Sequence, residues 1–455
     1  MKPKSNTETQ AKSNNKWMSS FLSLFYMGAG QIKNNQYIKG TLFLIYQTIL
    51  WFLNIDVISK GLIPKINVSF EPFYIVEYMQ KQIYGLFTLG TIPGEHHSLF
   101  FLIEGLMAVV FLIILVVIHI LNVVDAYKNG KLIDEGDEVG DFKRSIDVFL
   151  EEGFPYVGMS PGMIFLFAAT IFPVVFSVCL AFVNYDANHL PPGQILSWVG
   201  LRNFSDLLMF TQWRGTFIQV FTWTVIWSVT STILSYGLGL FVAVVLNHEH
   251  IKFRNIFRTV LLVPWAIPAF VSILIWRYLL NYNFGHVNKM MTLIGFSKVQ
   301  WLSDSFYAKI ALLLVNLWLS FPFAMAVCSG ILQSISETLY EAAIVDGATI
   351  FQKFFHITLP LVLRQVTPLL IMQFAFQFNN FGIIFLLNNG NPPIFGGAGS
   401  AGHTDILISW VYKLVIRKGL YSYGAAISII IFFVVAGFSI YQFRQSASFK
   451  EEELR

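Results

Sequence analysis

The sequence predicts an all-α polytopic membrane protein, and two observations support that fold class. Of the 455 residues, 55% are hydrophobic and only 12% are charged, whereas an average soluble chain carries roughly a quarter charged residues. Apolar runs also recur along the chain, each long enough to cross a hydrocarbon layer as a helix of about 20 residues. No stretch predicts a β-sheet. The runs predict about eight transmembrane helices, at 40–58, 98–121, 158–183, 216–247, 259–281, 307–332, 367–388 and 421–443.

The apolar stretch 17–30 is shorter than these runs, at about 14 residues, and is below the usual spanning length. Lysines ahead of it and small residues after it imitate a secretory signal peptide. The basic segment QIKNNQYIK that follows needs the cytoplasmic side of the membrane. We therefore expect a short N-terminal re-entrant or interfacial hairpin, which leaves open whether it crosses the membrane.

Basic residues indicate the orientation of the spans, because cytoplasmic loops carry an excess of lysine and arginine. About 18 of the 30 basic residues fall on one side of the membrane, and about 10 on the other, if the first side holds both termini and the segments 122–157, 248–258 and 333–366. Both termini are therefore expected in the cytoplasm.

Charge, cysteine content and motifs argue against several other functional classes. A formal net charge of +4, spread over many short loops, does not predict a nucleic-acid partner. Cys179 and Cys328 lie within apolar runs and support neither a disulfide framework nor a metal site. The glycine-rich stretch 397–404 approximates a phosphate-binding loop, but His403 replaces the required lysine, so we expect a flexible outer loop. No hydrolase signature is present, and we expect no catalytic residues.

The loops predict three segments. The stretch 122–157 is a mixed-charge, glycine-punctuated cytoplasmic linker. It ends an N-terminal segment, 1–157, that carries two extra spans; a six-span core, 158–443, and a cytoplasmic tail, 444–455, follow. The outer loops have about 25 to 40 residues each, fewer than the roughly 50 of a small domain. We therefore expect another chain to capture any external ligand.

The cytoplasmic loop 333–366 contains LYEAAIVDGATIFQKFFHITLP. Its small and apolar residues at helical spacing predict a short helix that ends at Gly347, and a second short helix that stops before Pro360. Two alanines leave a flat surface on which another protein can approach closely, with aromatic anchors nearby. An amphipathic connector lying on the membrane explains the same pattern.

The pattern Glu341-Ala342-Ala343, Gly347, Ile357 and Leu359-Pro360 resembles the EAA loop of permease subunits of binding-protein-dependent ABC importers. Over roughly 158–443 the chain is similar to the larger permease of maltose and maltodextrin importers, without the large outer insertion of some members. The resemblance implies an ABC importer permease core in a bacterial plasma membrane. It also implies partners: a second homologous permease, two cytoplasmic ATPase subunits that hold ATP and Mg, and an extracytoplasmic sugar-binding protein. The implied ATPase-coupling residues are Glu341, Ala342, Ala343, Asp346, Gly347, Ile357, Leu359 and Pro360.

Neutral polar residues recur within the predicted spans, whose centres are almost free of charge, and this disfavours an ion-coupled carrier. Gln373, Phe376, Gln377 and Asn380 have the spacing of one helical face, to which Asn316 and Phe323 can be added. Buried amides need partners, which are either neighbouring helices or a polar ligand. An aromatic face surrounded by amides is the expected lining of a carbohydrate site.

The resemblance implies a sugar site at the same place. The matching positions depart from the family pattern, because Ser320 replaces a usual glycine, Phe323 a tyrosine and Gln377 an asparagine; chain length and linkage of the sugar are therefore open. The implied substrate-binding residues are Asn316, Leu319, Ser320, Phe323, Phe376, Gln377 and Asn380.

The sequence thus predicts a non-enzymatic permease subunit of an ATP-driven carbohydrate importer, with an oligosaccharide, first of all maltose or maltodextrin, as substrate. The chain itself is expected to hold no cofactor. Another oligosaccharide, an ion-coupled secondary transporter and a membrane scaffold or receptor are the alternatives.

Overall fold

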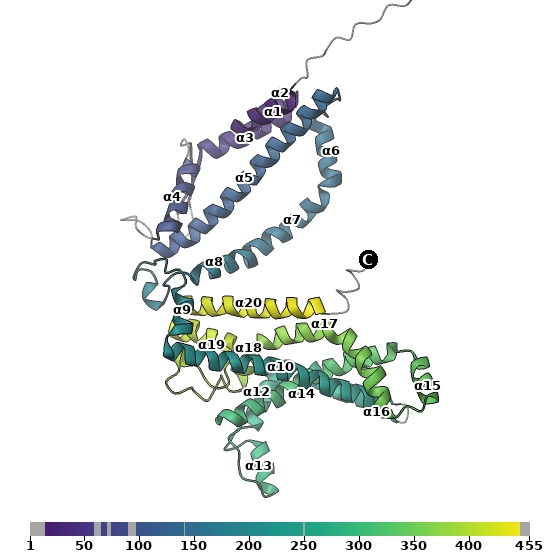
Figure 1. Ribbon diagram of the computed structural model, residues 1–455. Helices are drawn as coiled ribbons and strands as arrows, with labels where there is room; N and C mark the ends of the chain where they lie inside the picture. Colours follow the sequence, from purple (N-terminus) through teal and green to yellow (C-terminus); the bar gives the residue numbers. More distant parts are fainter. Residues whose placement is uncertain are drawn as a thin grey trace, which may run out of the picture. The chain divides into compact units, whose positions relative to one another are not determined.

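The computed structural model describes residues 14–58, 65–70, 74–89, 97–140, 142–248 and 251–445. Almost all of the described secondary structure is helical (Figure 1), which confirms the predicted fold class. The chain divides into two compact units, Met1–Cys179 with Asn188–Trp198, and Leu180–Ala187 with Val199–Arg455. The predicted span 158–183 falls mostly in the first unit, but this division does not test the predicted segment boundaries. Most of the tail 444–455 lies outside the described residues.

Among the described residues, six helices are long and apolar enough to span a membrane, and a bent helix pair makes up to seven. The chain is therefore a multi-pass membrane protein. The bounds of the six are Ser98–Glu135, Phe154–Leu180, Thr211–Asn247, Ser305–Ser334, Ile350–Phe378 and Tyr421–Arg444.

The first predicted span, 40–58, is wrong in its second half. Helix α3 (Tyr37–Phe52) has 16 residues, fewer than the roughly 20 that a span needs. The chain then forms β1 (Leu53–Ile58), which pairs antiparallel with β2 (Lys65–Phe70), Leu53 opposite Phe70. Polar and β-branched residues alternate in NIDVI and KINVSF, which is the strand period rather than the helical one. Among the described residues, this ribbon is the exception to the all-α prediction.

The first unit contains the predicted N-terminal hairpin. Helix α1 (Asn15–Phe25) and helix α2 (Ala29–Lys33) are joined at Gly28, whose φ of 90° suits glycine. The hairpin packs on α5 (Ser98–Glu135), where the Nδ2 of Asn34 donates to the Ala126 carbonyl at 2.9 Å. Trp17 and Phe21 keep about 60% of their surface exposed. Because 11 residues of α1 extend only about 16 Å, this helix is too short to cross a bilayer alone.

The rest of the described first unit consists of helices and the irregular segment 188–198. Its segment 188–198 packs on the ends of α4 and α5, with the Leu196 amide donating to Ser98 Oγ at 2.6 Å. The further elements are α4 (Tyr74–Thr88), α6 (Phe142–Glu152), α7 (Phe154–Leu166), a π-helical turn (Phe167–Ile171) and α8 (Phe172–Leu180).

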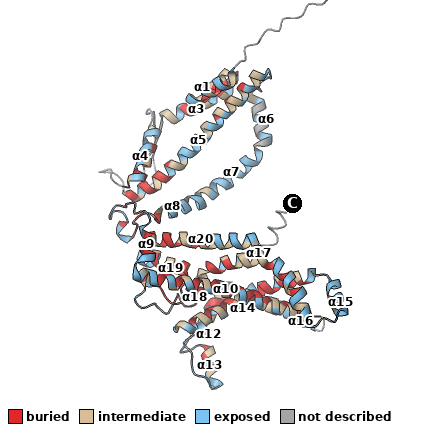
Figure 2. Ribbon diagram, viewed as in Figure 1, coloured by how far each residue is buried: buried red, intermediate tan, exposed pale blue. Residues whose placement is uncertain are grey.

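Helices α10 (Thr211–Asn247) and α14 (Ser305–Ser334) form the centre of the second unit (Figure 2). Two buried clusters lie along this helix pair. Trp227 and Leu312 belong to one of them, and Tyr236 and Met325 belong to the other. Gly239 brings the two helices close together, because a Cβ at this position would lie 2.6 Å from the Cβ of Ala324. The remaining elements of this unit are α9 (Arg202–Met209), α11 (Arg254–Ala266), α12 (Ala269–Leu279), α13 (His286–Leu293), α15 (Glu337–Val345), α16 (Ile350–Lys353), α17 (Leu359–Phe378), α18 (Phe381–Leu387), α19 (Leu407–Tyr412) and α20 (Tyr421–Gln445).

Two predicted spans of this unit are broken. The span predicted at 259–281 consists of α11 and α12, which are bent by 90°. Ile267 between them is extended, as expected for a residue before proline, and Pro268 caps α12. The span predicted at 367–388 ends as α17 at Phe378, and α18 begins after Asn380. Asn380 therefore lies in a helix break and not on one continuous helical face.

The loop 389–406, which contains the glycine-rich stretch 397–404, is attached to α10 by hydrogen bonds, and its flexibility and outer position stay predictions. Four residues of α10 bind it. Gln212 Nε2 donates to the Gly396 carbonyl, and Thr216 Oγ1 accepts from the Ala398 amide. Gln219 is hydrogen-bonded to His403, and Trp223 Nε1 donates to the Thr404 carbonyl. Their spacing of four, three and four residues puts them on one face of the helix. We call these four contacts the α10 ladder.

One contact of the α10 ladder depends on a histidine. Gln219 Nε2 lies 2.8 Å from Nδ1 of His403. Burial, and secondly the ammonium of Lys309, lower the pKa of His403 below its ordinary value. The imidazole is therefore neutral at pH 7 and its Nδ1 can accept the hydrogen bond. Because the folded-state pKa is the lower one, this contribution is present at neutral pH and is lost as the pH falls.

A buried ion pair closes the same loop. The ammonium of Lys413 lies 2.5 Å from the carboxylate of Asp405, and both side chains are almost fully buried. The Gly402 amide and the Ser409 hydroxyl also donate to this carboxylate, at 2.7 and 2.9 Å. Every oxygen of the carboxylate is thereby hydrogen-bonded, which is what a buried charge requires.

Asp405→Asn is expected to destabilise the second unit around the loop 389–406, because it leaves the Lys413 ammonium buried without a counter-charge. Breaking a buried pair from one side costs about 3–5 kcal/mol. In a detergent thermal-shift assay the variant should melt well below the wild type. The double variant Asp405→Asn/Lys413→Met removes both charges and should recover part of the loss; a double variant no more stable than the single one would contradict this explanation.

Candidate translocation site and coupling surface

The predicted coupling loop is a projecting turn at one end of the second unit (Figure 1). Helix α15 ends as predicted at Gly347, which has φ 76°. The Gly347 amide donates to the Ile344 carbonyl and the Ala348 amide to the Ala343 carbonyl, so the last carbonyls of the helix are capped. Thr349 and Gln352 then form a capping box that starts α16.

The second helix does not stop before Pro360, contrary to the prediction. It continues from α16 through a π-helical turn, Phe354–Thr358, into α17, whose first turn contains Pro360. Proline lacks a backbone N–H, and the π-helical turn directly before it is the kind of local adjustment that accommodates this loss inside a continuous helix. The coupling loop is thus directly continuous with a membrane-spanning helix.

The tip of this loop exposes large apolar side chains. Val345, Ile350 and Phe351 keep 75–87% of their surface accessible. Of the predicted coupling residues, Glu341, Ala342, Asp346, Gly347 and Pro360 are exposed, while Ala343, Ile357 and Leu359 are half-buried. Exposed apolar groups gathered at one tip mark an interaction surface. We call Leu339, Ile344, Val345, Ile350 and Phe351 with these residues the coupling surface.

One hydrogen bond ties the two halves of the loop together. Tyr340 Oη and Thr358 Oγ1 are 2.9 Å apart, which joins α15 to the π-helical turn. The sequence does not predict this contact, because no local spacing indicates that positions 18 apart meet across a turn.

The predicted sugar-site amides come together around the break between α17 and α18. Asn380 Nδ2 donates to Gln377 Oε1 at 3.0 Å and approaches Asn316 Oδ1 at 3.5 Å. Asn316 and Gln377 are buried, at 3% and 1% exposure, and Asn316 Nδ2 has no hydrogen-bond partner. A buried donor without a partner is costly, so this amide has an unused hydrogen-bonding capacity in the structure.

Ser320 is engaged with α10. Its hydroxyl donates to the Asn316 carbonyl at 2.5 Å and lies 2.6 Å from Ser235 Oγ. Ser235 Oγ also approaches the Ser231 carbonyl at 2.6 Å. Two hydroxyl protons cannot serve all three contacts at once. Ser235 is therefore a neighbour of the predicted site that the sequence analysis missed.

The predicted aromatic residues are the accessible part of the site. Phe376 is 62% exposed and Phe323 is 38% exposed. The ring of Phe323 lies 6.0 Å from that of Trp265, which follows Pro264 in the bent pair and was not predicted. Leu319 is half-buried and packs against the core around Trp227. The predicted site residues therefore comprise accessible aromatic rings and amide side chains that contact one another.

Comparisons with known proteins bear on this arrangement. Residues 235–447 match the family described as binding-protein-dependent transport system inner membrane component. The galactooligosaccharides transport system permease protein GanP of Bacillus subtilis is 39% identical over 426 residues, which cover 93% of this chain and 96% of that protein. This chain belongs to the binding-protein-dependent transport permeases. The family resemblance predicted from the EAA pattern is confirmed.

Other relatives of this permease are also transport permeases. The maltodextrin transport system permease protein MdxF of Bacillus subtilis is 38% identical over 94% of this chain and 95% of that protein. The maltose/maltodextrin transport system permease protein MalF of Vibrio vulnificus is 39% identical over 57% of this chain and 50% of its own length. A chain in the crystal structure of a bacterial ABC transporter that imports alginate shares the fold, with a TM-score of 0.56 at 23% identity over 67% of this chain and 98% of that chain.

Proposed function

We propose that this permease is a transmembrane subunit of an ATP-driven carbohydrate importer with maltodextrin as its substrate class. The observation that carries the proposal is the similarity over nearly the whole chain to permeases named for galactooligosaccharide and maltodextrin transport. Its partners are a second homologous permease, two cytoplasmic ATPases and an extracytoplasmic sugar-binding protein. ATP and Mg belong to the ATPases, and this chain carries out no catalysis. The membrane is a bacterial plasma membrane, with both termini in the cytoplasm.

The coupling surface is where the ATPases act. Its exposed apolar tip fits a groove on another protein, and the flat face at Ala342 permits close approach. Closure of the ATPase dimer around ATP moves this surface. Because α16 runs without interruption through the π-helical turn into α17, that movement reaches Phe376, Gln377 and the break at Asn380.

The rings and amides around that break hold the sugar. Phe376 and Phe323 offer faces to the C–H side of a glucosyl ring, and Asn316, Ser320, Gln377 and Asn380 offer neutral donors and acceptors to hydroxyls. Leu319 supports this wall from the core side.

A galacto-oligosaccharide is the second candidate, favoured by the 39% identity to GanP over 93% of this chain. Both candidates are neutral oligosaccharides, and the difference between them lies in linkage and in the orientation of one hydroxyl. A site that uses hydroxyl-directed amides can discriminate such isomers strongly, because a mismatched hydroxyl leaves a buried amide unpaired.

The test is to purify the tagged chain from its own cells in mild detergent and to measure ATPase activity with the binding-protein fraction and a panel of malto- and galacto-oligosaccharides. ATPase activity that rises with malto-oligosaccharides supports the proposal, and a rise with galacto-oligosaccharides alone replaces its substrate. A chain that purifies without any ATPase, and whose sugar uptake follows an ion gradient, would show a secondary transporter instead.

A further inference from the structure

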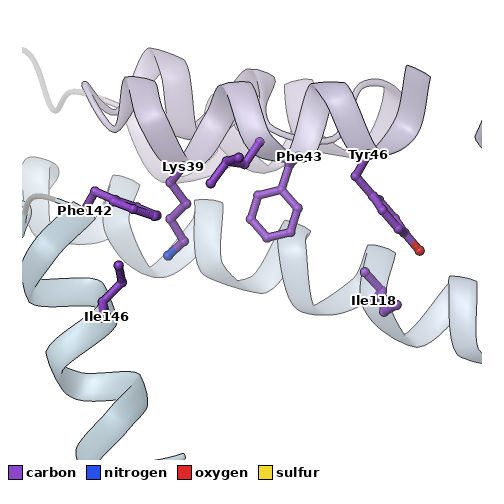
Figure 3. A pocket seen from close by; sticks show the side chains of 7 residues that line it. Lys39, Phe43, Tyr46, Ile118, Phe142 and Ile146 are labelled. Carbon is purple, nitrogen blue, oxygen red and sulfur yellow. The ribbon is translucent and has the colours of Figure 1, made fainter. Parts of the chain in front are cut away.

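A groove of about 480 Å³ lies in the first unit, between α3, α5 and α6. Its lining is Lys39, Leu42, Phe43 and Tyr46 of α3, Ile118 of α5, and Phe142 and Ile146 of α6. Figure 3 shows Lys39 and Phe43 directed from α3 toward α5, with Phe142 beside Lys39. All of these side chains except Lys39 are aliphatic or aromatic. The groove is therefore an apolar slot with one cation.

The sequence of α5 sets the depth of this groove in the membrane. Between Glu104 and Asp125 the helix has no Asp, Glu, Lys or Arg. That stretch is about 30 Å long as a helix, the thickness of the hydrocarbon layer. Asp125 therefore lies at one boundary of the hydrocarbon, and Ile118 lies about 10 Å inside it. The groove crosses from the headgroup layer into the acyl chains.

The single cation lies at the polar end of the groove. The Lys39 ammonium binds Asp125 at 2.7 Å and is only partly exposed. An ammonium has three N–H donors, and Asp125 is the only partner found for it among the described residues. Because Asp125 marks the expected boundary of the hydrocarbon, we expect the remaining N–H groups near the level of the bilayer phosphates. Side chains of α3 and α5 outside the groove, such as Ile45 and Ile120, are apolar and about half exposed.

We propose that this groove binds one phospholipid, with an acyl chain along Phe43, Tyr46 and Ile118 and the phosphate at the Lys39 ammonium. The chemistry matches at both ends: hydrocarbon meets an apolar wall at membrane depth, and an anionic phosphate meets a cation at the boundary. The lipid would add a contact between α6 and α3. The segments just before these two helices are already linked, because Gln36 Nε2 donates to the Gly140 carbonyl. The proposal does not depend on the transported substrate.

The first experiment counts lipids on the full-length permease, purified with whatever subunits accompany it, delipidated, and then titrated with phosphatidylglycerol under native mass spectrometry. Ile118→Trp fills the groove and should abolish retention of one phosphatidylglycerol per chain. Ile113→Trp adds the same side chain on a different face of α5, outside the groove, and should retain it. Elution volume and helical content must match the wild type for both variants.

The second experiment separates a phosphate contact from the ion pair. Lys39→Met should weaken retention by about tenfold, the size of one charge-assisted hydrogen bond. Asp125→Asn frees the ammonium and should retain the lipid at least as well as the wild type. If Lys39 only neutralises Asp125, the two variants will behave alike and the phosphate assignment fails. Glycerol phosphate should not displace the lipid, since it lacks the acyl chain; displacement would show a headgroup-only site.

The third experiment identifies the occupant directly. A photo-crosslinking phenylalanine in place of Tyr46 should yield an adduct of phospholipid mass in membranes. An adduct of the mass of another protein subunit would overturn the proposal, and so would equal lipid retention by the wild type and Ile118→Trp.

Discussion

Glu341→Lys is expected to reduce binding-protein-dependent sugar uptake by more than about tenfold while the permease still folds and inserts. Glu341 is exposed on α15, so reversing its charge leaves the packing of the chain intact. At a protein interface, a reversed central charge costs about 2 kcal/mol or more, since it opposes the partner's groups. Uptake of labelled sugar into cells, with the amount of co-purified ATPase measured in parallel, tests the expectation.

The matched control for this change is Glu138→Lys, which makes the same charge reversal at an exposed position of the first unit that does not belong to the coupling surface. This variant should transport like the wild type. If Glu341→Lys also transported normally and kept its ATPase, the assignment of the coupling surface would be wrong, and an ion-driven carrier would become the better explanation.

Phe376→Ala should leave stability and assembly near wild-type values and impair sugar-stimulated ATPase and uptake by roughly tenfold. The ring is mostly exposed and has no recorded ring partner among the described residues, so its removal leaves no cavity. Its loss removes the stacking surface that the proposed site offers to a sugar, and an aromatic contact of this kind contributes about 0.5–1.5 kcal/mol beyond its buried area.

Phe374→Ala supplies the contrast, two residues earlier on the same helix. Phe374 is buried, with its ring 4.0 Å from that of Phe438 and 5.8 Å from that of Phe378. Its truncation should cost about 3–5 kcal/mol of stability and lower the melting temperature, without a specific effect on sugar dependence. Equal behaviour of the two variants would remove Phe376 from the site.

Hydropathy located the membrane helices because lipid requires long apolar runs, but it could not find where those runs break. The bend between α11 and α12 depends on Ile267 and Pro268, and a proline in an apolar run is also compatible with an unbroken helix. The end of α17 depends on Asn379 and Asn380, whose amides bond to the backbone and to neighbouring side chains. The predicted span 40–58 ran too far past α3, because mean hydropathy does not register the alternation of polar and apolar residues that begins at the strand β1.

The candidate site was partly accessible to sequence reasoning. Gln377, Asn380 and Asn316 could be proposed from amides placed in apolar runs, and the structure brings them together. Trp265 and Ser235 could not, because only the bend of one helix and the packing of another place them beside Phe323 and Ser320. Such neighbours are set by tertiary contacts between residues that are far apart in the chain.

The α10 ladder has a mechanical consequence. A loop without such contacts would deform when displaced and leave the helix in place. Here the four contacts at Gln212, Thr216, Gln219 and Trp223 attach the loop to the helix. We therefore expect a displacement of residues 396–404 to be transmitted to the N-terminal half of α10, whose C-terminal half packs closely against α14 at Gly239.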